Sequence, residues 1–192
     1  MLSPDGIEGA PNLIELASMP AADAEREIAG YQEAFGVFAR PGLVSIALVQ
    51  GHAVGAGFQL ALACDLRIAA DDAQFSMAEV KLGLVPDLGG TKRLIELVGY
   101  SRAAGICLTG RPVPAAEALS IGLVTEVVRP GELARAGEAY VQQLLALPWE
   151  AVTEIKALLL AAADHRQPEQ EAAKRAAQYR RLRAMTGLER EA

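Results

Sequence analysis

A glycine turn and two acidic residues have the types and spacing that could do chemistry in this 192-residue chain. Gly55-Ala56-Gly57 follows an apolar, strand-like run and precedes a helix-like run. Such a turn should leave unpaired backbone N–H groups at the start of the helix, and the helix dipole there also favours an anionic oxygen. Glu79 and Asp87 follow in segments marked by glycine and proline. Hydrogen-bond donors for an oxyanion, together with acids on nearby segments, predict chemistry next to a carbonyl group.

Glu79 is the candidate for proton transfer, because it stands among apolar neighbours in the segment SMAEVKLG. An ordinary surface glutamate is the simpler interpretation of the same residue. Gln59 lies near the start of the expected helix. An amide cannot act as a base at neutral pH, although it can orient water or donate a hydrogen bond to a ligand. A polar helix-start residue facing a cavity is the alternative for Gln59.

Asp87 lies in the segment LVPDLGG, between a proline and two glycines. A second acid at this distance from Glu79 could assist a proton shuttle along a substrate. Aspartate is also common in turns bounded by proline and glycine, where its side chain bonds to the nearby backbone. Both interpretations remain open from the sequence.

Hydrophobic periodicity predicts the elements that position these residues. An almost continuous apolar run at 43–49 is typical of a strand covered on both faces. Thr91 and Ser101 are expected as hydroxyl N-caps of two helices. Strands are expected at residues 43–49, 66–70, 74–77 and 123–128. Helices are expected at residues 13–17, 20–39, 58–64, 91–98, 101–108, 115–120, 132–146, 149–163 and 168–186.

Strands alternate with helices up to Pro130-Gly131, and only helical patterns follow. This order predicts a mainly parallel α/β core over residues 1–130 and a helical region over residues 131–192. Hydrophobic residues make up 52% of the chain but aromatic residues only 5%, so aliphatic and alanine side chains must fill the core.

The charge and cysteine content restrict the partners and the compartment. The net charge of −6 argues against nucleic acid or an anionic membrane as the main partner, because both bind basic surfaces. Cys64 and Cys107 lie in apolar helical surroundings and are expected to be free thiols in a reducing compartment. With no secretory signal and no spanning apolar run, the chain is predicted to be cytoplasmic. No metal-ligand spacing or dinucleotide fingerprint occurs, so neither a metal nor a separate cofactor is expected.

Three ordered segments resemble the crotonase family, the enoyl-CoA hydratase/isomerase superfamily. They read VQGHAVGAGFQLALACDLRIAADDAQF, EVKLGLVPDLGGTKRL and LTGRPVPAAEALSIGLVTEVV. The resemblance covers Gly42 to Arg129 and implies a spiral of ββα units with C-terminal helices that assemble a homotrimer, or a hexamer as a dimer of trimers. The family's N-terminal strands and its first oxyanion-hole loop have no counterpart before Gly42, which implies an N-terminally shortened core.

The resemblance also implies roles for the candidate residues. The backbone N–H of Ala56 corresponds to the family's second oxyanion-hole donor for an acyl-CoA thioester, with Gly55, Gly57 and Gln59 binding the substrate. Glu79 corresponds to one of the two catalytic glutamates of the family's hydratases, and Gln59 replaces the other. Asp87 stands where several family isomerases carry an acid.

Three functions follow from these assignments. Enoyl-CoA isomerase activity would move a double bond through a thioester enolate, in fatty-acid or aromatic-acid metabolism. A related hydratase-like activity would use Glu79 as its only acid. The third is a non-catalytic acyl-CoA-binding or regulatory protein with a degenerate active site.

Overall fold

The computed structural model describes residues 13–164 and 166–186. The chain forms two compact units, the first made of residues up to 39 with residues 45–139, and the second made of residues 40–44 with residues from 140 onward. The change from the first unit to the second falls inside helix α7 (Leu133–Leu145). The domain division expected after residue 130 stays a prediction.

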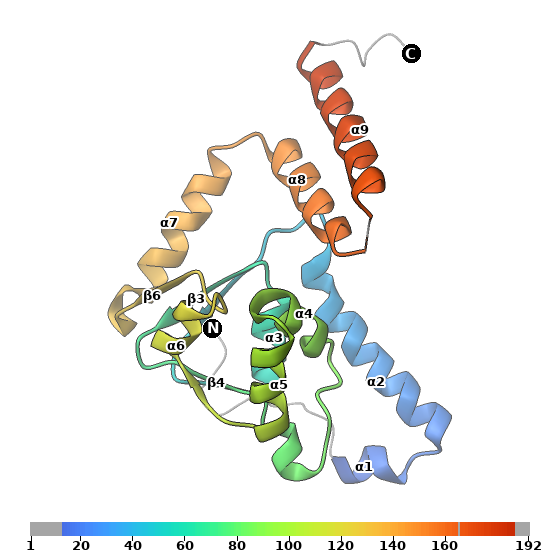
Figure 1. Cartoon of the computed structure of the whole chain (residues 1–192), viewed down its shortest axis with the longest axis vertical. Helices are drawn as coiled ribbons and strands as arrows, with labels where there is room; N and C mark the ends of the chain where they lie inside the picture. Colours follow the sequence, from blue (N-terminus) through green and yellow to red (C-terminus); the bar gives the residue numbers. More distant parts are fainter. Residues whose placement is uncertain (1–12, 165, 187–192) are drawn as a thin grey trace. The chain divides into compact units, whose positions relative to one another are not determined.

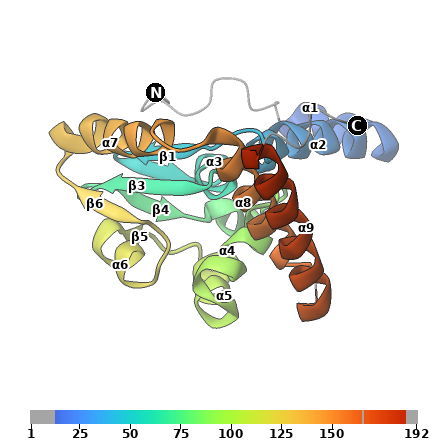
Figure 2. The ribbon, with the colours of Figure 1, turned by 90° about the horizontal axis from the view of Figure 1, so that it is seen from above.

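The first sheet of the first unit is entirely parallel. Its strands are β1 (Ile46–Val49), β3 (Leu66–Ala70) and β6 (Glu126–Val128), in the order β1-β3-β6. Figure 2 shows β3 between its two neighbours. Residues 67–70 of β3 are buried. The apolar run at 43–49 predicted a strand covered on both faces, which is wrong for β1: only Val49 of its residues is buried, and Leu48 is 44% exposed.

A second sheet carries the segment that leads into the candidate site. Its strands are β2 (His52–Val54), β4 (Gln74–Ser76) and β5 (Val113–Pro114); β2 and β4 are parallel, whereas β4 and β5 are antiparallel. Gly51, with a φ of 64°, separates β1 from β2, and the two strands belong to different sheets. The sequence analysis missed β2 and β5 because strands of three and two residues leave almost no periodic signal.

The helices of the first unit are labelled in Figure 1. They are α1 (Leu13–Ser18), α2 (Ala21–Gly36), α3 (Ala56–Ala63), α4 (Gly90–Val98), α5 (Tyr100–Thr109) and α6 (Ala115–Ser120), with 3₁₀ helices η1 (Val37–Ala39), η2 (Ala78–Leu82) and η3 (Pro130–Glu132).

The expected hydroxyl caps of α4 and α5 are wrong. The N-cap residues are Gly89 and Gly99, and neither helix has a side-chain cap. Both glycines have a positive φ, 85° and 77°, which glycine adopts without strain. Thr91 and Ser101 lie inside the first turn instead, because each helix begins one residue earlier than expected.

The core of the first unit lies around α3 and β4. The rings of Phe58 and Phe75 are tilted by 53°, with their centroids 5.4 Å apart. Leu62, Met77 and Leu94 pack in the same cluster and are almost completely buried. Each such side chain stabilises the fold by about 1.5–3 kcal/mol when removed from water. Eight buried alanines complete the interior, as the low aromatic content predicts.

Arg67 is a buried charge that backbone carbonyls satisfy. Its guanidinium donates to the carbonyl oxygens of Cys64 at 2.7 Å and of Leu123 at 2.8 Å. Burial lowers the pKa of Arg67 from its ordinary value. The Asp65 carboxylate accepts hydrogen bonds from the amide and hydroxyl of Ser45, at 2.8 and 2.9 Å. These contacts hold the junction between α3 and β3 in place.

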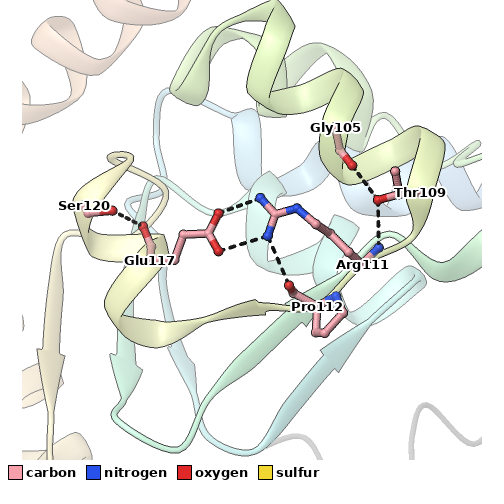
Figure 3. A network of polar contacts seen from close by, with 6 residues as sticks. All are labelled: Gly105, Thr109, Arg111, Pro112, Glu117 and Ser120. Atoms are coloured by element: carbon pink, nitrogen blue, oxygen red, sulfur yellow. Dashed lines mark hydrogen bonds and ion pairs between the residues drawn. The ribbon is translucent and has the colours of Figure 1, made fainter.

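A bidentate ion pair joins the end of α5 to α6 (Figure 3). Arg111 contacts the two carboxylate oxygens of Glu117 at 2.9 and 2.5 Å, and its backbone amide donates to the Thr109 hydroxyl at 3.2 Å. The hydrogen bond from Arg111 holds the pKa of Glu117 below its usual value.

From residue 140 onward, the described part of the second unit consists of helices and short connections, as predicted. It contains the end of α7 with α8 (Trp149–Ala162) and α9 (Gln167–Thr186). The Arg180 guanidinium donates to both oxygens of Glu154, at 2.8 and 2.7 Å, and thereby ties α9 to α8. Buried Lys156 donates to the carbonyl of Leu43. Among the described residues, no helix is long and apolar enough to cross a bilayer.

Candidate active site

The bend that begins α3 has a backbone conformation that favours glycine. Gly55 has φ 55° and ψ −119°, and its amide donates to the carbonyl of Ser76 at the end of β4, at 2.8 Å. The first helical hydrogen bond runs from the Gln59 amide to the Gly55 carbonyl, at 2.9 Å. Across the described residues, no protein acceptor takes a hydrogen bond from the Ala56 amide. The bend therefore presents an open donor, as the sequence predicts.

Glu79 lies directly beside this bend. It is carried by η2, although the sequence analysis placed it in a loop. A Cβ atom built on Gly55 would lie 3.4 Å from Oε1 and 4.0 Å from Oε2 of Glu79. Oε2 is buried and has no hydrogen-bond partner within the described part of the chain. An unpaired buried carboxylate oxygen is costly, which is typical of an atom that serves a ligand or a reaction.

Gln59 connects Glu79 to the loop that carries Asp87, through the amides of Leu88 and Gly90, which the sequence analysis did not include in the site. Its side chain is only 1% exposed, and its Nε2 donates to Oε1 of Glu79 at 2.8 Å. Its Oε1 accepts from the amides of Leu88 and Gly90, at 2.9 and 3.2 Å. Because two N–H donors face one end of the side-chain amide and a carboxylate faces the other, these partners determine its orientation.

Gly90 lets this loop approach Gln59. A Cβ atom at residue 90 would lie 2.7 Å from Cγ of Gln59, closer than real Cβ contacts allow. Gly90 therefore belongs to the site through its small size as well as its amide. The glycine pair in LVPDLGG was the available signal, but the sequence analysis used it only as the mark of a turn.

Asp87 lies in the loop that contacts Gln59. Its carbonyl accepts a hydrogen bond from Nε2 of Gln32 in α2, at 2.6 Å, and the next residue, Leu88, donates to Gln59. The Asp87 side chain is half-buried. No hydrogen bond or ion pair between described residues joins its carboxylate to Glu79 or Gln59. Of the two predicted acids, only Glu79 is hydrogen-bonded to Gln59 among the described residues.

Cys107 of α5 shares the surroundings of Glu79. Burial raises the pKa of the Cys107 thiol, and the negative charge of Glu79 raises it further. Neither Cys107 nor Cys64 forms a disulfide bond in this structure. His52 is exposed on β2, and in the described part of the chain no three His, Cys, Asp or Glu side chains are grouped to hold a metal ion.

Residues 15–186 match the family model for enoyl-CoA hydratase/isomerase. The chain belongs to the enoyl-CoA hydratase/isomerase family. A curated relative of this family, the probable enoyl-CoA hydratase echA8 of Mycobacterium leprae, is 41% identical over 131 residues, which cover 68% of this chain and 50% of the relative. The short-chain-enoyl-CoA hydratase of Clostridium acetobutylicum is 49% identical over 88 residues, covering 46% of this chain and 34% of that protein.

Solved structures confirm the predicted crotonase-like α/β fold of the family. A Thermobifida fusca YX protein assigned as an enoyl-CoA hydratase, in complex with CoA, is 49% identical with a TM-score of 0.84 and covers 88% of this chain and 66% of its own. The same protein in complex with acetoacetyl-CoA is 51% identical with a TM-score of 0.82, covering 84% and 64%. The chain spans about half the length of the first curated relatives that it matches.

Proposed function

We propose that this chain acts on acyl-CoA thioesters by proton transfer at the carbon next to the thioester carbonyl, as an enoyl-CoA isomerase. The observation that carries the proposal is the position of Glu79 at Gly55, where a buried, unpartnered carboxylate oxygen lies next to the glycine that immediately precedes the open Ala56 amide. Removing a proton from that carbon places negative charge on the thioester oxygen. A fixed N–H donor for this oxygen contributes about 3 kcal/mol to the stability of the transition state.

Gln59 favours isomerisation over the two-acid addition of water. Its amide is not basic, and its side-chain oxygen already accepts two backbone hydrogen bonds. Among the described residues, Glu79 is then the only acid hydrogen-bonded into this network. In the proposed reaction the C2–H bond breaks as an O–H bond forms on Glu79, and the enolate shifts the double bond. The same proton then bonds to C4, so no water is consumed.

The remaining assignments complete the proposed site. Gly55 and Gly57 leave room for the thioester at the start of α3, since neither carries a side chain. Asp87 is proposed as an assisting acid farther along the acyl chain. CoA enters as part of the substrate, which the CoA-bound Thermobifida fusca structures support, and no separate cofactor is proposed.

Hydration is the second candidate, and the names of the relatives favour it. The Mycobacterium leprae and Clostridium acetobutylicum proteins are both named as hydratases. In this case Glu79 alone would activate water, and the second N–H of the Gln59 side chain would orient it. A homotrimer or a hexamer is the proposed assembly, which light scattering tests.

Turnover in ¹⁸O-labelled water separates these candidates. An isomerase converts a 3-enoyl-CoA to its 2-enoyl isomer with an absorbance change and without label in the product. Hydration instead places the label at C3. Glu79→Gln should lower either activity by about 10²–10⁴-fold, because the general acid–base is lost. If calorimetry shows that the chain binds an acyl-CoA but the assays show neither isomerisation nor hydration, the chain is a non-catalytic binding protein and the proposal is refuted.

A further inference from the structure

Three hydrogen bonds form a continuous connection from the loop before α4 to the carboxylate of Glu79. The amides of Leu88 and Gly90 donate to Oε1 of Gln59, and Nε2 of Gln59 donates to Oε1 of Glu79. All of the atoms belong to the first unit. Leu88 and Gly90 follow Gln59 by 29 and 31 residues in the sequence, and Glu79 of η2 follows it by 20.

We propose that Gln59 is a positioning residue that makes Oε2 of Glu79 the single proton-exchanging atom. This inference rests on the proposed function, because it assumes that Glu79 accepts a proton from an acyl-CoA. Gln59 itself neither gains nor loses a proton in the proposed step. It acts through Glu79 by keeping Oε1 hydrogen-bonded while the substrate C–H bond breaks and the new O–H bond forms on Oε2.

The hydrogen-bond inventory supports a fixed role for each oxygen. Oε1 of Glu79 accepts from Gln59, whereas Oε2 is buried and lacks a partner among the described residues. Rotating the Gln59 amide by half a turn would point its NH₂ group at two backbone N–H donors. Leaving those buried donors unpaired would cost about 1–3 kcal/mol each. The Gln59 side chain is therefore held in one orientation, and so is the donor that faces Glu79.

The loop that orients Gln59 is itself held from two directions. Gln32 of α2 donates to the carbonyl of Asp87, and Gly90 lies so close to Gln59 that a Cβ atom there would be 2.7 Å from Cγ. The position of the loop and the position of the carboxylate are thus linked through one buried side chain. A displacement of about 1 Å at a reacting group can lower a rate about 10²-fold.

Exchange of the C2 proton can be measured separately from double-bond migration, and this measurement tests the positioning role. Butanoyl-CoA is incubated in D₂O with the full chain, and deuterium at C2 is followed by mass spectrometry, which gives kcat and KM for proton removal. Gln59→Met keeps the length of the side chain but removes its donor and its acceptor. We expect kcat for exchange to fall about 10- to 100-fold while KM stays within about threefold, because the thioester contacts remain.

Two further variants separate positioning from folding. Gln170→Met removes the other buried glutamine, whose Nε2 donates to the carbonyl of Leu158 in the second unit at 2.9 Å. It should leave the kcat for exchange unchanged. Gln59→Glu restores an acceptor for Leu88 and Gly90 and, by sharing one proton with Glu79, a donor as well. It should recover part of the exchange that Gln59→Met loses.

Each outcome bears on one proposal. Wild-type chain that binds butanoyl-CoA but exchanges no C2 proton refutes the proposed function. Wild-type exchange with an unchanged kcat in Gln59→Met refutes the positioning role and leaves the proposed function standing. The positioning role is also refuted if Gln59→Met lowers the melting temperature and kcat and raises KM, and if Gln59→Glu recovers none of these losses. Gln59 would then serve only the fold.

Discussion

The carboxylate of Glu79 lies over Gly55, so that a side chain on this glycine would begin 3.4 Å from Oε1. Gly55 therefore has two constraints: its backbone conformation favours glycine, and the Glu79 carboxylate lies beside it. This relationship joins the turn to the candidate acid, which lies 24 positions later in the sequence.

Gly55→Ala should impair both stability and activity. The backbone of residue 55 has a φ of 55°, which costs about 1–2 kcal/mol for a residue with a Cβ atom, and the new methyl group would lie in van der Waals contact with Glu79. We expect the free energy of unfolding to fall by this amount and kcat to fall further than stability explains. Denaturant titration and turnover assays measure the two effects. Gly30→Ala in α2, where nothing lies within 4 Å, is the control and should stabilise the helix slightly.

Gly90→Ala should reproduce the loss of activity that follows from displacing Gln59. The new Cβ would lie 2.7 Å from Cγ of Gln59, so one of the two must move. Overpacking of this kind costs about 1–3 kcal/mol of stability. Chemical denaturation and C2-proton exchange report the two consequences. Gly105→Ala in α5 has open space and should keep the wild-type exchange rate; equal rates for all three proteins would contradict the tight packing at residue 90.

The ion pair between Arg111 and Glu117 should contribute to stability only above acidic pH. Arg111 lowers the folded-state pKa of Glu117 from its ordinary value of 4.5, so the contribution is complete above that value and disappears as pH falls through the lower folded-state pKa. Both side chains are a third or more exposed, so solvent screening limits the pair to about 1 kcal/mol at most. Glu117→Gln should therefore destabilise the protein at pH 7 and match wild type near pH 2 in thermal melts.

Arg67→Met should destabilise the first unit without touching the candidate site. The substitution removes the donor shared by the carbonyls of Cys64 and Leu123 and leaves them buried. The expected loss is about 2–3 kcal/mol in the free energy of unfolding, measured with urea. A variant as stable as wild type would show that water replaces the guanidinium at these carbonyls.

Cys107 should report the charge of Glu79. In a Cys64→Ser background, alkylation by iodoacetamide is expected to be slow at neutral pH, because burial and Glu79 both raise the pKa of the Cys107 thiol. Glu79→Gln removes the second cause and should speed the reaction, by less than about tenfold since burial is the larger cause. A rate that does not change would show that the two groups do not interact in solution.

The order and type of most elements were predictable from the sequence. The continuous apolar run before the glycine turn, the periodic helices and the change of pattern after Pro130 are local signals, and the corresponding long elements occur within a few residues of their expected bounds. Elements of two to five residues, namely β2, β5 and η2, were missed or placed in loops, because they form through pairing and packing with distant segments.

The sequence by itself also determined the turn at Gly55 to Gly57 and made Glu79 the candidate acid, because a residue's type and its immediate neighbours set both its conformational range and its chemistry. Only the tertiary structure decided which oxygen of Glu79 is free, that Gln59 holds the other, and that the carbonyl of Asp87 accepts from Gln32. Those outcomes depend on hydrogen bonds between residues 20 to 55 positions apart. The hydrogen-bond partner of a buried polar atom depends on which distant residues the packing brings near it, and the local sequence does not indicate which residues these are.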